Sequence, residues 1–163
     1  MKRFRFLQSL GFIAAAPLAA SSLGPLVAGK SRGVSGGCAL VPAETAGPFP
    51  LDLTDTLFYF RQDIREDRTG IPLRQKIRVV GLENCEPMAN VRVNIWHCDA
   101  EGNYSGYGSE VGTTYLRGYQ LTDANGECEF ITIFPGWYPG RTTHVHFQVH
   151  VSTSYSAVSQ WTW

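Results

Sequence analysis

Charge is scarce in this sequence. Of its 163 residues only 17% are charged, and 14 basic residues balance 14 acidic ones. A balanced charge argues against a nucleic-acid-binding protein, which usually carries a basic surplus. Residues 30–163 contain no apolar run long enough to span a bilayer. Disorder is also disfavoured, because 44% of the chain is hydrophobic and 12% is aromatic.

Long helical patterns are missing too, whereas short alternating runs separated by turns are common. Such runs predict strands at Lys76 to Leu82, at residues 90–97, and at Leu116 to Thr122, Glu127 to Phe134 and Thr143 to Val151. Asp123-Ala124-Asn125-Gly126 is a strong hairpin signal between two of these strands. Residues 51–75 are polar and mixed, which favours a loop. The sequence therefore predicts an all-β fold, an antiparallel β-sandwich with long irregular loops.

The N-terminus has the order of a secretory signal. Lys2, Arg3 and Arg5 form a basic start, an interrupted apolar stretch covers residues 7–20, and small residues follow to Ser22. We therefore predict that residues 1–29 are an export signal cleaved between Ala20 and Gly29. Residues 30–163 would then form a single domain in the periplasm or outside the cell.

Cysteines are few, and none form a CxxC pair, which argues against a zinc knuckle. The four are Cys38, Cys85, Cys98 and Cys128. In an oxidising compartment an even number suggests disulfides, with three possible connectivities. The alternative is that the cysteines are small buried hydrophobic residues.

Histidine is scarce as well, and three of the four histidines fall in the last predicted strand. Because successive side chains of a strand point to opposite faces, this strand has an apolar face and a histidine-bearing face. The apolar face, which we expect to join the core, comprises Val145, Phe147, Val149 and Val151. The other face comprises His144, His146, Gln148 and His150. One metal ion can bridge His144 and His146, whereas His150 lies roughly 13 Å beyond His146.

A His-x-His pair taken alone is more often a solvated strand face than a metal site. The remaining histidine, His97, continues the face of Val93 and Ile95 and reads as a strand-end residue. Further ligands would therefore come from another residue type. The candidates in the two loops are Tyr104, Tyr107 and Tyr138. Phenolate oxygen suits a hard ion such as Fe(III).

Four segments resemble motifs of the intradiol ring-cleavage dioxygenases, and they occur in the family's order. The first is a Thr-x-Gly-Pro-aromatic segment at residues 45–49. The second and fourth resemble the family's two ligand motifs, and the third resembles its central hairpin. These three span Trp96 to Ser105, Arg117 to Gly126 and Pro135 to Phe147. The resemblance covers about residues 45–150 and is strongest to the exported branch of the family.

The resemblance implies one non-haem Fe(III) ion in the loops, with a small aromatic diol and O2 as substrates. The ion would be held by Tyr104, Tyr138, His144 and His146. Tyr138 would also accept a substrate proton, Arg141 would be the active-site arginine, and Gln160 would lie near the substrate. The product would be a cis,cis-muconate-type diacid. A carboxylated substrate would need a further cation, for which the sequence offers Arg65, Arg68 and Arg117.

Other predictions accompany this resemblance. Trp96 and Trp137 are expected to be packing aromatics, and Asp99 is expected to make a turn bond. The family continues past His-x-His into another strand, whose start Ser159-Gln160 resembles. Because the sequence ends at Trp163, we expect the domain to lack the family's C-terminal strand. Two alternatives stay open: a non-catalytic β-sandwich binding module of the same fold, and a zinc or copper protein that uses the histidine pair.

Overall fold

The computed structural model describes residues 38–53, 56–152 and 156–163, so the predicted export signal lies outside the described residues. The strands are β1 (Pro72–Arg78), β2 (Arg92–Trp96), β3 (Arg117–Leu121), β4 (Glu127–Ile133), β5 (His144–His150) and β6 (Ser156–Thr162). Two short 3-10 helices, η1 (Leu57–Tyr59) and η2 (Gly108–Glu110), lie in connecting segments. No helix within these described ranges is long and apolar enough to cross a membrane.

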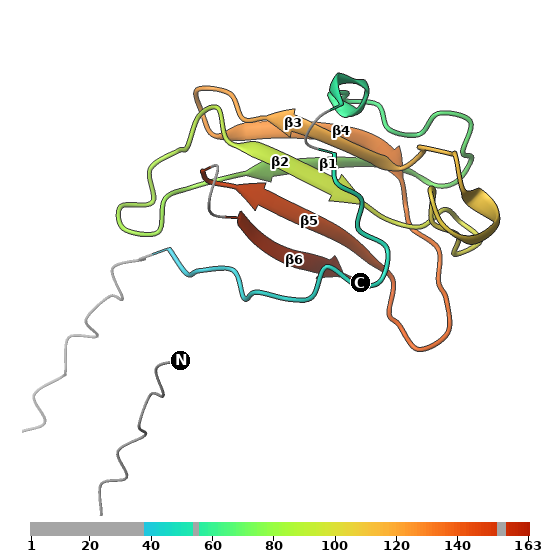
Figure 1. The fold of residues 1–163 in the computed structure, drawn as a ribbon. Helices are drawn as coiled ribbons and strands as arrows, with labels where there is room; N and C mark the ends of the chain where they lie inside the picture. The colour runs from blue at the N-terminus through green and yellow to red at the C-terminus, as the bar shows by residue number, and fades with distance from the viewer. Residues whose placement is uncertain (1–37, 54–55, 153–155) are drawn as a thin grey trace, which may run out of the picture. The chain divides into compact units, whose positions relative to one another are not determined.

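The strands form two antiparallel sheets (Figure 1). One sheet pairs β1 with β4, and the other has the order β3-β2-β5-β6. The sheets pack over one apolar core. Its buried members are Ile64, Ile77, Val93, Ile95, Cys128, Phe130, Val145 and Phe147. The predicted all-β sandwich is confirmed. β5 turns Val145, Phe147 and Val149 of the predicted apolar face to the core, whereas the prediction is wrong for Val151, which follows the strand and is exposed.

Five predicted strands are present, but the first is displaced. β1 begins at Pro72 and ends at Arg78, four residues before the predicted end at Leu82. Its outward positions are exposed and mostly charged, so the apolar alternation that marks the other strands is weak here. The prediction of loop across residues 51–75 is therefore wrong for the last four of them.

The predicted hairpin at residues 123–126 is only half correct. The turn forms, with Gly126 at φ +73° and its N–H donating to the Asp123 carbonyl at 3.0 Å. The flanking strands do not pair, because β3 pairs with β2 and β4 pairs with β1. A Cβ at Gly126 would lie 2.5 Å from the Val79 carbonyl oxygen. This close approach seats the turn against the end of β1, so it carries the chain from one sheet to the other.

β6 was not predicted as a strand, and it contains the Ser159-Gln160 pair. It pairs with β5 along its whole length, from His144 opposite Thr162 to His150 opposite Ser156. Residues 38–50, which we call the N-terminal arm, run beside β6 (Figure 1). The Glu44 N–H donates to the Val158 carbonyl at 2.9 Å. The expected absence of the family's C-terminal strand stays a prediction that the structure does not test.

The cysteines divide between the two expectations. Cys38 and Cys85 form a disulfide with a Cα–Cα distance of 5.5 Å. Cys98 and Cys128 are free and buried, so they are the small core residues of the alternative interpretation. The disulfide ties the start of the N-terminal arm to the turn region that precedes β2.

Candidate metal centre

The four ligands implied by the family resemblance converge on one point. His144 and His146 lie at the start of β5 on its non-core face, and both are buried. The His144 Nε2 atom lies 3.1 Å from His146 Nε2 and 3.2 Å from each of the Tyr104 and Tyr138 hydroxyl oxygens. The interpretation of the histidine pair as a solvated strand face is therefore wrong.

This donor set fits a metal ion. His144 Nδ1 lies 2.7 Å from the Thr142 carbonyl oxygen, an acceptor, so Nδ1 carries the hydrogen and Nε2 the lone pair. The single lone pair on His144 Nε2 cannot form hydrogen bonds with three polar neighbours at once. One cation at this place, in contrast, could be coordinated by all four side chains. Two imidazole nitrogens and two phenol oxygens suit a hard trivalent ion. In the described part of the chain, no group of three or more His, Cys, Asp or Glu residues could hold a metal, so tyrosines would have to complete the site.

Burial shifts the pKa values of these candidate ligands. Desolvation lowers the pKa of His146 to about 3 and also lowers the pKa of His144, with the His144 ring adding to the shift at His146. Both imidazoles are therefore neutral at pH 7, as ligands must be. Desolvation raises the pKa of Tyr104 well above 10. Tyr104 would thus stay protonated until a cation stabilises its phenolate.

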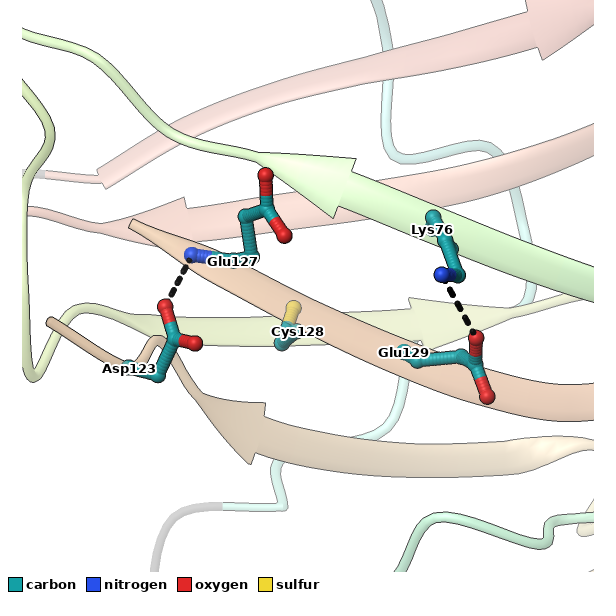
Figure 2. A pocket seen from close by; sticks show the side chains of 5 residues that line it. All are labelled: Lys76, Asp123, Glu127, Cys128 and Glu129. Carbon is teal, nitrogen blue, oxygen red and sulfur yellow. Dashed lines mark hydrogen bonds and ion pairs between the residues drawn. The ribbon is translucent and has the colours of Figure 1, made fainter. Parts of the chain in front are cut away.

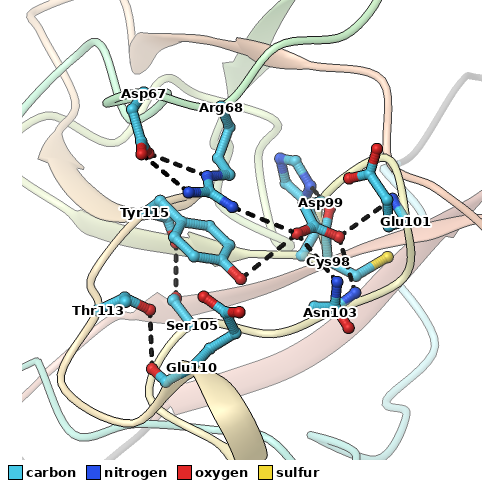
Figure 3. Close-up of polar contacts among 11 residues, drawn as sticks. Asp67, Arg68, Cys98, Asp99, Glu101, Asn103, Ser105, Glu110, Thr113 and Tyr115 are labelled. Carbon is cyan, nitrogen blue, oxygen red and sulfur yellow. Dashed lines mark hydrogen bonds and ion pairs between the residues drawn. The ribbon is translucent and has the colours of Figure 1, made fainter.

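The loop that carries Tyr104 is built around a buried carboxylate (Figure 3). Asp99 Oδ1 accepts the backbone N–H groups of Glu101 at 3.1 Å and Asn103 at 2.8 Å, which confirms the predicted turn bond. Arg68 lies 3.8 Å from Asp99 Oδ2, and its guanidinium sits 4.4 Å from the centre of the Tyr115 ring. These contacts hold the loop in place directly before the candidate ligand Tyr104.

The two tyrosine-bearing loops approach each other closely at glycines. The Gly136 N–H donates to the Asp99 carbonyl at 2.9 Å, and a Cβ at Gly136 would lie 2.3 Å from the Ala100 carbonyl oxygen. A Cβ at Gly102, which has φ +92°, would lie 2.9 Å from the Trp137 carbonyl oxygen. No larger residue fits at either place, so these glycines allow Tyr104 and Tyr138 to meet.

The N-terminal arm forms another side of the site. A Cβ at Gly47 would lie 3.0 Å from His146 Cε1, and the Phe49 ring stacks on Tyr104 with centroids 4.5 Å apart. The fully buried Arg117 donates to the Phe49 carbonyl at 2.9 Å and to the Ser105 carbonyl at 2.8 Å. Arg117 therefore joins the arm to the Tyr104 loop. The sequence offered Arg117 only as a possible substrate cation and did not predict this structural role.

Arg141 and Gln160 are brought together. Arg141 Nη2 donates to Gln160 Oε1, and Gln160 Nε2 donates to the Thr45 carbonyl at 2.9 Å. Gln160 is the register partner of His146 across β5 and β6. The arm thus orients the glutamine that in turn holds the arginine beside the ligand strand.

The remaining aromatic candidates lie outside the donor cluster. Tyr107 donates its hydroxyl to the Pro50 carbonyl, and Tyr115 bonds weakly to Asp99 at 3.5 Å. Trp96 is buried, as predicted. Trp137 is 62% exposed, so its prediction as a packing aromatic is wrong; the backbone of this residue, rather than its indole, makes the close contact with Gly102.

The other charged and histidine candidates also have local partners. His97 bonds to Thr132 Oγ1 at 2.7 Å and to the Cys98 carbonyl at 2.8 Å, which confirms it as a strand-end residue. Burial lowers its pKa to about 4. Arg65 pairs with Asp63 at 2.7 Å. With Arg68 and Arg117 bonded as described above, all three candidate substrate cations are engaged within the protein.

A separate shallow hollow lies on the β1–β4 sheet and is lined by Lys76, Asp123, Glu127, Cys128 and Glu129 (Figure 2). Its acidic groups serve local structure. Asp123 accepts the backbone N–H groups of Asn125 and Glu127, each at 2.8 Å, and these bonds lower its pKa. Lys76 lies 3.7 Å from Glu129. The hollow is therefore not a second candidate site.

This chain is similar to known proteins in sequence and in structure. Residues 55–161 match the family described as "Dioxygenase". The protocatechuate 3,4-dioxygenase beta chain of Burkholderia cepacia is 31% identical over 122 residues, which are 66% of this chain and 48% of that protein. The chain thus spans about half the length of this curated relative.

Two solved structures are also similar. An intradiol ring-cleavage dioxygenase from Tetranychus urticae is 34% identical with a TM-score of 0.68, covering 76% of this chain and 64% of that one. The dioxygenase domain of a dioxygenase and carbohydrate-binding protein fusion from the cellulolytic bacterium Streptomyces sp. SirexAA-E is 28% identical. Its TM-score is 0.60, and the match covers 73% of this chain and 71% of that one.

Proposed function

Because this chain belongs to the intradiol ring-cleavage dioxygenase family, we propose that it binds one non-haem Fe(III) ion and uses O2 to cleave a catechol-type ring. Cleavage falls between the two hydroxyl-bearing carbons and yields a cis,cis-muconate-type diacid. The observation that carries the proposal is the convergence of two phenol oxygens and one imidazole nitrogen within 3.2 Å of His144 Nε2.

The four donors would hold the ion. The difference in burial between the two tyrosines indicates which of them would also contact the substrate. A bound Fe(III) supplies a Lewis acid that also orients the substrate oxygens. Tyr104 is buried beneath Phe49, whereas Tyr138 is only half-buried. We therefore expect substrate to approach Tyr138 rather than Tyr104, and the Tyr138 oxygen would take up a proton from a catechol hydroxyl.

Arg141 would stabilise negative charge on the substrate. Its guanidinium is a planar cation that can pair with anionic oxygens, and its bond to Gln160 holds it beside the strand that bears His144 and His146. A fixed cation of this kind stabilises charge that develops during reaction without having to reorganise. Gln160 would act by orienting Arg141, since its amide is itself held by the Thr45 carbonyl.

The visible spectrum of the iron-loaded full chain tests the proposal. We expect a phenolate-to-Fe(III) absorption band that shifts when catechol is added without oxygen, and O2 uptake with ring-opened product when oxygen is admitted. Tyr104→Phe and Tyr138→Phe should each alter the band, whereas the matched Tyr107→Phe should leave it unchanged, because Tyr107 bonds to Pro50 outside the cluster.

Each failure of this experiment points to one alternative. A colourless protein that takes up no iron would refute the dioxygenase proposal. Tight zinc or copper binding in its place would favour the histidine-pair metalloprotein. Iron binding without O2 uptake would favour a non-catalytic binding module of the same fold.

We also propose that the protein is exported, with residues 1–29 as the signal. The Cys38–Cys85 disulfide supports export, because disulfides persist in oxidising compartments. Mass spectrometry of the chain recovered from the periplasm or the medium should show a new N-terminus between Ala20 and Gly29. Recovery of the full-length chain from the cytoplasm alone would contradict export.

A further inference from the structure

The two histidine ligands are held in different ways. His144 has a hydrogen bond from Nδ1 to the Thr142 carbonyl at 2.7 Å, which orients its ring. The Nδ1 atom of His146 is buried, and it has no hydrogen-bond partner within the described residues. A ligand histidine usually owes its orientation to such a bond. Something else must therefore orient the ring of His146.

A hydrogen bond matters here because the ring can rotate. The torsion between Cβ and the imidazole is broad and roughly two-fold, so it has no sharp preference of its own. Rotation about this bond moves Nε2 away from the donor cluster. A ring without a hydrogen bond thus needs contacts with its face to define the plane.

Trp96 supplies such a face. It is the register partner of His146 across β2 and β5, and the two rings stack with centroids 5.0 Å apart and planes within 3° of parallel. The indole is buried, and its Nε1 atom has no hydrogen-bond partner among the described residues. The place of this side chain is therefore explained by its ring surface and not by a polar contact.

Two other neighbours lie close to the His146 ring and restrict its movement. The His144 ring meets it edge to face at 4.7 Å, and the arm passes so close at Gly47 that a Cβ there would lie 3.3 Å from Nε2. A near-parallel stack exists at only one ring plane. A partial rotation of the imidazole would break it, whereas a half-turn would keep the plane and exchange the places of Nε2 and Cε1.

We propose that Trp96 is a positioning residue for the iron site, which sets the plane of the His146 ring by stacking in place of the missing hydrogen bond. The proposal rests on the proposed function in so far as His146 is an iron ligand. It assigns to Trp96 a role in metal binding that is separate from its contribution to packing.

Three variants of the full chain test this role. Trp96→Leu removes the aromatic face, and Trp96→Phe keeps a smaller one. The matched control is Trp161→Leu, because Trp161 also stacks on a β5 residue, Phe147, with centroids 4.0 Å apart, but on the core side of the sheet. Both leucine variants lose an indole and a stacked pair, and only Trp96→Leu releases a ligand.

We expect Trp96→Leu to weaken Fe(III) binding about 10-fold or more in competition with a chelator, in the range seen for residues that orient ligands. Its phenolate-to-Fe(III) band should shift. Trp96→Phe should keep most of the affinity, and Trp161→Leu should keep the affinity and band even if it unfolds at a lower temperature. In the metal-free protein, nitrogen-15 NMR should show one sharp set of His146 ring signals that broadens in Trp96→Leu only.

The outcomes separate the two proposals. Parent-like iron affinity and ring signals in Trp96→Leu would overturn the role of Trp96, as would equal losses in Trp161→Leu. If the parent chain takes up no iron, the proposed function fails. The NMR comparison then decides whether Trp96 orients His146.

Discussion

Replacing His144 with alanine will weaken Fe(III) binding by at least about 100-fold and remove the phenolate-to-Fe(III) band, a loss beyond that expected for residues outside the ligand set. The reason is the position of its Nε2 atom, which lies within 3.2 Å of the other three donors. Without it, the donors from β5 and the two loops have no common centre. Chelator competition and the visible spectrum of the variant measure the effect.

His150→Ala is the matched control for this substitution. His150 lies on the same strand and the same face but is half-buried outside the cluster, with its ring 3.0 Å from the Asn94 amide nitrogen. It should bind iron like the parent chain. Full iron binding by His144→Ala, or an equal loss in His150→Ala, would show that the four donors are not the metal site.

The sequence predicted the strands whose apolar residues alternate, and it failed where alternation was weak. β2, β4 and β5 each place apolar side chains in the core at every second residue, whereas β3, which was also predicted, contributes no residue to that core. β1 exposes charged side chains at its outward positions, so its start was missed. β6 buries Ser159 and Gln160 rather than aliphatic residues. It becomes a strand because it pairs with β5.

The turn residues at 123–126 predicted where the chain reverses its direction. They did not predict which strands the flanking segments pair with. Asn125 and Gly126 predicted a tight turn correctly, since the turn needs a residue at positive φ. Whether the strands on either side pair depends on what else lies against them. Here Val79, the residue after β1, donates its N–H to the Gly126 carbonyl at 2.8 Å. This long-range contact accompanies the pairing of β4 with β1 in the other sheet.

The candidate ligands could be named from the sequence, whereas the residues that support them could not. The two tyrosines and two histidines implied by the family resemblance lie together at one point of the fold. The support comes from pairs distant in sequence, such as Trp96 with His146 and Arg117 with Phe49. No local pattern marks such pairs, because each depends on the register between strands or on the path of the N-terminal arm.

The start of the N-terminal arm is cross-linked to the rest of the domain by the Cys38–Cys85 disulfide. Replacing Cys38 and Cys85 together with serine will lower the free energy of unfolding by about 4 kcal/mol. The two residues are 47 apart in sequence, and a cross-link that closes a loop of this length restricts the unfolded chain by roughly that amount. Urea unfolding of the parent and the variant, each without metal, measures the difference.

Loss of the disulfide should also weaken metal binding at the candidate site. The arm stacks Phe49 on Tyr104, places Gly47 against His146, and offers the Thr45 carbonyl to Gln160. Its other bonds, such as the one from Glu44 to Val158, keep it near β6 but do not fix its first residue. We therefore expect iron binding to weaken in the double variant, by less than in His144→Ala, because all four ligands remain.

A reductant distinguishes the disulfide from other effects of the substitutions. Dithiothreitol should destabilise the parent chain to the level of the Cys38→Ser/Cys85→Ser variant and leave that variant unchanged, since Cys98 and Cys128 are already free. If the reductant lowers the stability of both proteins equally, the cause lies outside this bond. If it changes neither, the arm is held to the sandwich by its hydrogen bonds and ring contacts alone, and the stabilising role of the disulfide is refuted.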